Sequence, residues 1–291
     1  MAAVTSTLTA LAIARPVHPF FKEPGASGRV LASFDRSCYV ETTEGQLIAV
    51  LAETLGRGAF ALTVGGTPSF AALRPESPVS VAERTLHLGQ MRIDLSSAVP
   101  WDPALPALGG APDEGMRMLA AHLRANTPPE GLARVQFDDV ETPLLTQGRR
   151  ALDRLRSGLA RADAAAITDA AVQLAGLGPG LTPSGDDVIA GILLALRVWP
   201  EVAGPLGATV VSTLLIATAA PRTGRISRAY LWAARQGHAS EAWHDLTRGL
   251  AGATGSVVAA ATRILQTGET SGAEMLAGFL FGWTRVYPSS S

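Results

Sequence analysis

Cysteine is nearly absent from this chain, which has Cys38 as its one cysteine among 291 residues. A single thiol excludes an internal disulfide framework and any metal cage built from cysteines, and it fits a reducing cytoplasm. We expect Cys38 to be a small buried residue of a strand, since unpaired cysteine behaves as a hydrophobic side chain.

An excess of either charge is also lacking. The 24 basic residues almost balance the 25 acidic ones, and the formal net charge at pH 7 is −1. Such a chain has no general basic field that would attract nucleic acid, so we expect no nucleic-acid partner.

Segments that would direct the chain to a membrane are missing as well. Residues 1–19 have no basic region ahead of their apolar stretch, as a secretory signal would. Residues 202–220 carry no charge, but glycine, proline and hydroxyl residues interrupt them, which favours a buried core helix over a membrane span. We therefore expect a cytoplasmic protein without a membrane partner.

The first third of the sequence has the pattern of β-strands. Short segments rich in β-branched and aromatic residues alternate with Gly, Pro, Ser or Asp. They predict strands at residues 29–34, 37–42, 46–52, 60–64 and 85–95, the last with the clearest alternation. Residues 100–113 contain four prolines and two adjacent glycines, which is typical of a connection between domains.

From Glu114 onward the apolar residues recur three or four positions apart, which indicates helices. We predict an α+β fold in which residues 1–110 form a mainly β domain and residues 111–291 form a helical domain. The predicted helices cover residues 115–126, 144–163, 167–178, 188–199, 207–219, 226–236, 241–250, 256–266 and 273–286.

The most informative segment is residues 176–191, GLGPGLTPSGDDVIAG, a glycine-rich loop that precedes a helix. Glycines let backbone N–H groups approach a ligand, and a helix start adds unpaired donors, so the pair suits phosphate or carboxylate. Thr182 and Ser184 add hydroxyl donors. No lysine follows the glycines as in a Walker motif, and the spacing differs from a dinucleotide fingerprint.

Asp186 and Asp187 at the helix start leave two interpretations open. A carboxylate pair is suited to Mg²⁺ that also contacts a substrate phosphate. The helix dipole favours acids at the same place, and Ser184 with Asp187 has the spacing of a capping box. Capping does not explain the glycines or the additional carboxylate of Asp186.

A second copy of the helix start occurs 87 residues later. Residues 184–193, SGDDVIAGIL, align with residues 271–280, SGAEMLAGFL, where Ser271 and Glu274 repeat the capping spacing. The recurrence indicates two equivalent helix starts, although one match in a chain rich in alanine and glycine also arises by chance.

A cluster of arginines lies at residues 221–228, PRTGRISR. Arginine forks match carboxylate and phosphate geometry, so Arg222 and Arg225, with the hydroxyls of Thr223 and Ser227, are candidates to bind an anion. The alternative is an exposed helix start with Thr223 or Ser227 as its cap, which is our interpretation of Arg228. The histidines show no metal-ligand spacing and no serine or cysteine partner in the sequence, so they indicate no hydrolase triad, and we interpret each as a surface or packed residue. They are His18, His87, His122, His238 and His244.

At GLGPGLTPSGDDVIAG the sequence resembles a bacterial family of the AllH type, whose namesake is a subunit of the oxamate carbamoyltransferase of anaerobic allantoin breakdown. Weaker similarity occurs at Thr223, Ile226 and Ser227, and at residues 30–34, 93–101, 234–237, 270–272 and 276–278. The chain departs from the family at the second motif, where it has Glu269 and Glu274 instead of a histidine-like residue and an aspartate. This departure leaves the acceptor substrate open.

The resemblance implies a transferase subunit that works with FdrA-like and AllG-like subunits and exchanges a carbamoyl group between phosphate and oxamate. We expect Asp186 and Asp187 to be catalytic, or to orient the loop or a metal. The expected substrate-binding residues are Gly178, Gly180, Thr182, Ser184, Gly185, Arg222, Thr223, Arg225, Ser227, Ser271 and Glu274. A noncatalytic regulatory or scaffold subunit that uses the same loop is the alternative.

Overall fold

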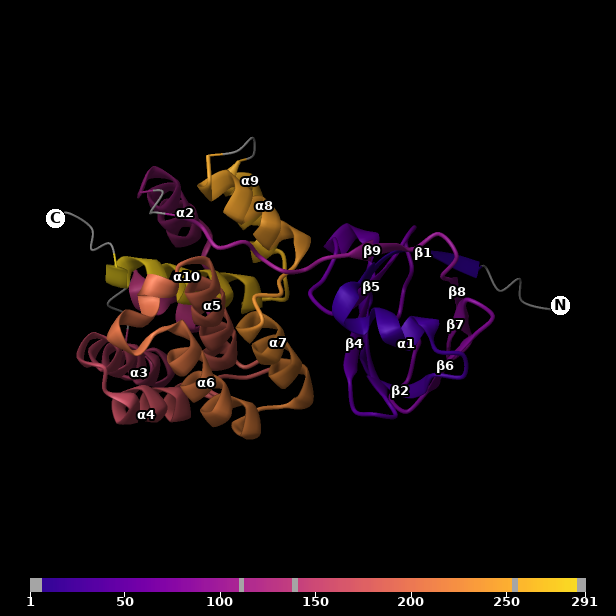
Figure 1. Cartoon of the computed structure of the whole chain (residues 1–291), viewed down its shortest axis with the longest axis horizontal. Coiled ribbons are helices and arrows are strands. Elements are labelled where there is room, and N and C mark those ends of the chain that lie inside the picture. The colour runs from indigo at the N-terminus through magenta and orange to yellow at the C-terminus, as the bar shows by residue number, and fades with distance from the viewer. Residues whose placement is uncertain (1–6, 110–112, 138–140, 253–255, 287–291) are drawn as a thin grey trace. The chain divides into compact units, whose positions relative to one another are not determined.

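The computed structural model describes residues 7–109, 113–137, 141–252 and 256–286. The chain divides into two compact units, Met1–Pro103 and Ala104–Ser291 (Figure 1). Strands make up the first unit and helices the second, which confirms the predicted α+β fold.

The strands of the first unit form one sheet that closes on itself into a barrel. Its order is β5-β4-β3-β2-β6-β7-β8-β1-β9, and β1 also pairs with β5. Closure removes the exposed edges that an open sheet would present. The strands are β1 (Thr7–Ala14), β2 (Ser27–Ser33), β3 (Ser37–Thr42), β4 (Leu47–Ala52), β5 (Ala61–Val64), β6 (Pro78–Ala82), β7 (Thr85–Leu88), β8 (Met91–Asp94) and β9 (Val99–Trp101).

The inner face of this sheet is formed by alternate residues of its strands. In β3 every second side chain is buried, and Cys38 among them is fully buried as predicted. The predicted single strand at residues 85–95 is wrong: Gly89 adopts a φ of 58°, and β7 and β8 pair antiparallel across the turn at this residue. Three short helices accompany the sheet, namely η1 (Arg15–Val17), α1 (His18–Lys22) and η2 (Glu53–Leu55).

The second unit is helical around one core that includes the rings of Trp199, Trp243 and Phe279. Helix α5 lies at its centre, since all of its residues except Arg197 are buried. The helices are α2 (Asp113–Asn126), η3 (Leu132–Gln136), α3 (Pro143–Arg161), α4 (Ala164–Leu174), α5 (Ser184–Val198), η4 (Pro200–Leu206), α6 (Ala208–Ala219), η5 (Ala220–Arg222), α7 (Arg225–Arg235), α8 (Glu241–Leu250), α9 (Val257–Leu265) and α10 (Ser271–Val286).

Several predicted helix boundaries need correction. The helix predicted at residues 167–178 is α4 at Ala164–Leu174, and residues 175–178 belong to the loop that follows it. Helix α5 begins at Ser184 instead of Val188, and α10 begins at Ser271 instead of Ala273. The uncharged residues 202–220 are divided at Gly207, whose φ is 79°, into η4 and α6. Among the described residues, no single helix is long and apolar enough to span a membrane, and one bent pair, α5 with η4, reaches that length and composition together.

Candidate functional site at the glycine-rich loop

In residues 176–180 of the loop between α4 and α5, the sign of the backbone φ angle alternates from residue to residue. Gly176, Gly178 and Gly180 have φ angles of 72°, 105° and 96°, whereas Leu177 and Pro179 between them do not have positive φ. Side chains with a Cβ rarely adopt such angles, which explains why glycine occupies these three positions. Turns that contain such residues are among the backbone conformations whose successive N–H groups form concave sites for anions.

Free donors lie at the tip of this loop. Pro179, Gly180 and Leu181 are exposed, Leu181 at 52%. Within the described part of the chain, the N–H groups of Gly180 and Leu181 have no hydrogen-bond partner. The start of α5 differs, because Gly185 N–H donates to the Leu177 carbonyl at 2.8 Å and Asp186 N–H to the Pro183 carbonyl at 2.9 Å. The donors accessible to an anion therefore belong to the loop.

Asp186 connects this loop to the start of α7. Its side chain is 1% exposed. Oδ1 accepts a hydrogen bond from Gly176 N–H at 2.9 Å, and Oδ2 accepts from Ser227 Oγ at 2.7 Å and from Thr223 Oγ1. The structure thus brings three of the predicted residues together, and both carboxylate oxygens are occupied by protein donors.

This arrangement does not fit the Mg²⁺ that the sequence suggested. Mg²⁺ in proteins is held through carboxylate oxygens that face it, and those of Asp186 face N–H and O–H donors instead. The described residues contain no group of three or more His, Cys, Asp or Glu side chains placed to hold a metal ion.

Residues 221–228, which we call the arginine-bearing segment, lie beside the loop. A Cβ built on Gly176 would be 3.2 Å from the Arg222 carbonyl oxygen, and one on Gly224 would be 4.0 Å from that of Leu181. Arg222 and Arg225 are exposed. Arg222 also donates to the Thr218 carbonyl at 2.7 Å, so it holds the end of α6 as well as flanking the loop.

Asp187 belongs to a different, buried cluster beneath the loop. Its carboxyl is 3% exposed and accepts hydrogen bonds from the hydroxyls of Ser271 and Thr182, which lie 2.9 Å apart. Glu274 is fully buried and accepts from Leu132 N–H at 3.0 Å, Thr270 Oγ1 at 3.2 Å and the Ser184 hydroxyl.

Burial is the largest cause of the pKa shifts of these two acids. Loss of solvent raises the pKa of Asp187 well above its ordinary value, the Ser271 hydrogen bond lowers that pKa in part, and the charge of Glu274 raises it further. Burial also raises the pKa of Glu274, against the Ser184 hydrogen bond. Oδ2 of Asp187 has no hydrogen-bond partner among the described residues.

The capping-box interpretation of Ser184 is wrong. Pro183 is the N-cap of α5, and no side chain caps the helix. The hydroxyl of Ser184 instead crosses to Glu274 of α10. Leu132 and Thr270 were not among the predicted site residues, since no pattern in the sequence connects η3 or a single threonine with an acid on another helix.

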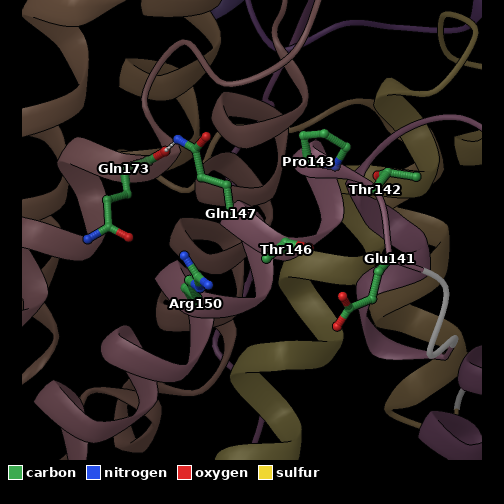
Figure 2. A pocket seen from close by; sticks show the side chains of 7 residues that line it. All are labelled: Glu141, Thr142, Pro143, Thr146, Gln147, Arg150 and Gln173. Carbon is green, nitrogen blue, oxygen red and sulfur yellow. Dashed lines mark hydrogen bonds between the residues drawn. The ribbon is translucent and has the colours of Figure 1, made fainter.

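Two hollows lie elsewhere on the helical unit. The larger, of about 680 Å³, lies at the start of α3 (Figure 2), where the Gln147 amide donates to the Gln173 carbonyl at 3.2 Å. The smaller, of about 330 Å³, is lined by Arg124, Thr127, Pro129, Arg134 and Phe137. Neither is lined by a residue of the predicted site.

Two family models match this chain. Residues 9–100 match the model described as the AllH family N-terminal domain, and residues 174–283 match that of oxamate carbamoyltransferase subunit AllH. The second match contains the glycine-rich loop, the arginine-bearing segment and both buried acids. No curated protein and no solved structure matches the chain.

Proposed function

The chain belongs to the AllH family, and from this premise we propose that it is a carbamoyltransferase subunit that binds small anionic substrates at its glycine-rich loop. The substrates we propose are carbamoyl phosphate together with oxamate, or oxalurate with phosphate in the reverse direction. The observation that carries the proposal is the exposed loop tip with two unpartnered N–H groups beside Arg222 and Arg225.

The chemistry of carbamoyl transfer fits such a site. The amide nitrogen of oxamate forms a bond to the carbamoyl carbon, the bond from that carbon to the phosphate oxygen breaks, and the nitrogen loses a proton as phosphate leaves. Charge grows on the departing phosphate, so N–H donors and guanidinium groups fixed around it lower the barrier. Holding both anions in one place supplies the positioning that a two-substrate reaction requires.

The name of the family is that of a subunit, which supports a complex of several chains. We propose FdrA-like and AllG-like subunits as the partners and the cytoplasm as the compartment. Leu181 at the loop tip favours a second candidate function, a noncatalytic subunit, since an apolar side chain that is 52% exposed suits contact with a partner chain.

Reconstitution separates these two functions. The chain is combined with FdrA-like and AllG-like subunits, assembly is measured by size-exclusion chromatography, and oxalurate formation is measured from carbamoyl phosphate and oxamate. For a transferase subunit, Arg225→Ala lowers turnover at least tenfold with assembly intact, whereas Arg117→Ala, an exposed arginine of α2, changes neither. Loss of assembly by Arg225→Ala with full turnover per assembled complex would favour the scaffold.

A further inference from the structure

The buried acids form a reciprocal arrangement across the packed helices α5 and α10. The hydroxyl of Ser184 on α5 binds Glu274 on α10, and the hydroxyl of Ser271 on α10 binds Asp187 on α5. Ser271 and Glu274 are the residues 87 positions after Ser184 and Asp187. Each contact is therefore the counterpart of the other.

The backbones of the two helices repeat this reciprocity. A Cβ on Gly191 would be 1.9 Å from the Met275 carbonyl oxygen, and one on Gly278 would be 2.1 Å from that of Val188. The same shift of 87 positions converts one contact into the other. A local two-fold relation thus governs both the hydrogen bonds and the close approach of α5 and α10.

The segments that enter the two helices also correspond. Leu177 N–H donates to the Leu174 carbonyl and Thr267 N–H to the Ile264 carbonyl, both at 2.9 Å. Gly185 N–H then donates to the Leu177 carbonyl at 2.8 Å, and Gly272 N–H to the Thr267 carbonyl at 3.0 Å. The unit therefore contains two equivalent modules, α4–loop–α5 and α9–loop–α10.

The first loop is longer than the second. Residues 178–183 separate Leu177 from Ser184, whereas only residues 268–270 separate Thr267 from Ser271. Gly178 and Gly268 are equivalent, because both have positive φ and a Cβ on either would lie against the serine hydroxyl, at 2.8 Å and 3.2 Å. The additional residues are Pro179–Leu181, the exposed tip.

Asp186 is the other feature of the first module alone, since the equivalent residue of α10 is Ala273. It is Asp186 that holds Thr223 and Ser227, and through them the arginine-bearing segment, beside the loop. The two features that only the first module has, residues 179–181 and Asp186, therefore both lie where the loop meets the start of α7.

We infer that Pro179–Leu181, with Arg222 and Arg225, is the ligand-contact element of this unit and takes a small oxyanion, whereas the paired serines and acids are a shared structural frame. Asp186 is a positioning residue, which acts by fixing the arginine-bearing segment. This inference rests on the proposed function, and it separates the predicted site into contact residues and frame residues: Ser184, Asp187, Ser271 and Glu274 belong to the frame.

A matched pair of variants at the loop tip tests the contact element. Leu181→Pro removes the N–H donor, and Leu181→Ala keeps the donor and removes only the exposed side chain. We expect calorimetric titration of the full chain with inorganic phosphate and carbamoyl phosphate to show affinity at least tenfold weaker for Leu181→Pro than for Leu181→Ala. Equal affinities of the two variants would overturn the inference.

Deletion of residues 179–181 provides the second test. The second module forms the same frame with a loop of this shorter length, so the deleted chain is expected to fold, with retained helical circular dichroism and cooperative melting, and to lose phosphate binding. A folded deletion variant that still binds phosphate contradicts the inference and the proposed binding site, but it leaves the assignment as a carbamoyltransferase subunit intact. Absence of binding by the unaltered chain contradicts both the inference and the proposed function.

The positioning role of Asp186 is tested through its hydroxyl partner. Thr223→Val removes the hydrogen bond to Asp186, and Thr223→Ser retains it. We expect phosphate affinity to fall several-fold in Thr223→Val and to be restored in Thr223→Ser. Loss of affinity in both variants, or in neither, would contradict the role assigned to Asp186.

Discussion

Asp186 and Asp187 are adjacent in sequence and have opposite environments. Asp186 accepts hydrogen bonds from a backbone N–H and two hydroxyls that hold the loop to α7. Asp187 faces another carboxyl, Glu274, and keeps one oxygen without a described partner. One residue therefore anchors the loop to α7 through its hydrogen bonds, whereas burial raises the pKa of the other.

The first prediction concerns Asp186→Asn. Asparagine replaces one acceptor oxygen of Asp186 with an NH₂ group, which cannot accept a hydrogen bond. At least one buried donor then loses its acceptor, so we expect the free energy of unfolding to fall by about 3 kcal/mol. Urea denaturation measures this change. Asp169→Asn, which alters an exposed ion pair with Arg154, is the control and is expected to cost less than about 1 kcal/mol. Equal costs would contradict the anchoring role.

The second prediction concerns pH and Asp187. Because its pKa is raised in the folded state, the folded chain retains a proton that the unfolded chain loses above about pH 4, so stability falls as pH rises from there toward the folded pKa. Asp187→Asn removes this titration. We expect the variant to gain stability relative to the unaltered chain as pH rises, measured by urea denaturation at several pH values. Parallel pH profiles would contradict the assignment.

The sequence identified this pair of acids but could not separate their roles. Both satisfy the preference for acids at a helix start, and the local sequence provides no further distinction. The difference comes from Thr223 and Ser227 on one side and Ser271 and Glu274 on the other, which only the tertiary fold brings close.

At the scale of helices, the contact between α5 and α10 depends on two glycines. The third prediction is that Gly191→Ala lowers the free energy of unfolding by about 3 kcal/mol, because the added Cβ would overlap the Met275 carbonyl oxygen. Gly109→Ala, where a Cβ meets no atom within 4 Å, is the matched control for chemical denaturation. A small and equal effect of the two substitutions would show that the helices are not closely packed there.

The recurrence of 87 residues was visible in the sequence, but the boundaries of the two helices were not. Periodicity placed the start of α5 at Val188 because Ser184, Asp186 and Asp187 are polar. In the structure these polar residues are buried within the helix, since partners on α7 and α10 satisfy them. A local pattern of apolar residues does not report such pairing.

At the scale of the molecule, the helical unit has a core of its own. Its buried cluster extends from Leu105 to Trp283 without a residue from the sheet. The fourth prediction is that a fragment of residues 104–291 folds alone and unfolds cooperatively in urea, as expected for a domain with a separate core. A fragment with helical circular dichroism but no cooperative transition would contradict this.

We propose above all that this chain binds the anions of carbamoyl transfer. The most direct test is the melting temperature of the full chain at constant ionic strength with carbamoyl phosphate, phosphate, oxamate or oxalurate, and with chloride as the reference anion. Binding to the folded state at a hundredfold excess over Kd stabilises it by about 2.7 kcal/mol. We predict a rise of several degrees with carbamoyl phosphate or phosphate, which Leu181→Pro abolishes and Leu181→Ala retains. An unchanged melting temperature with all four anions would contradict it.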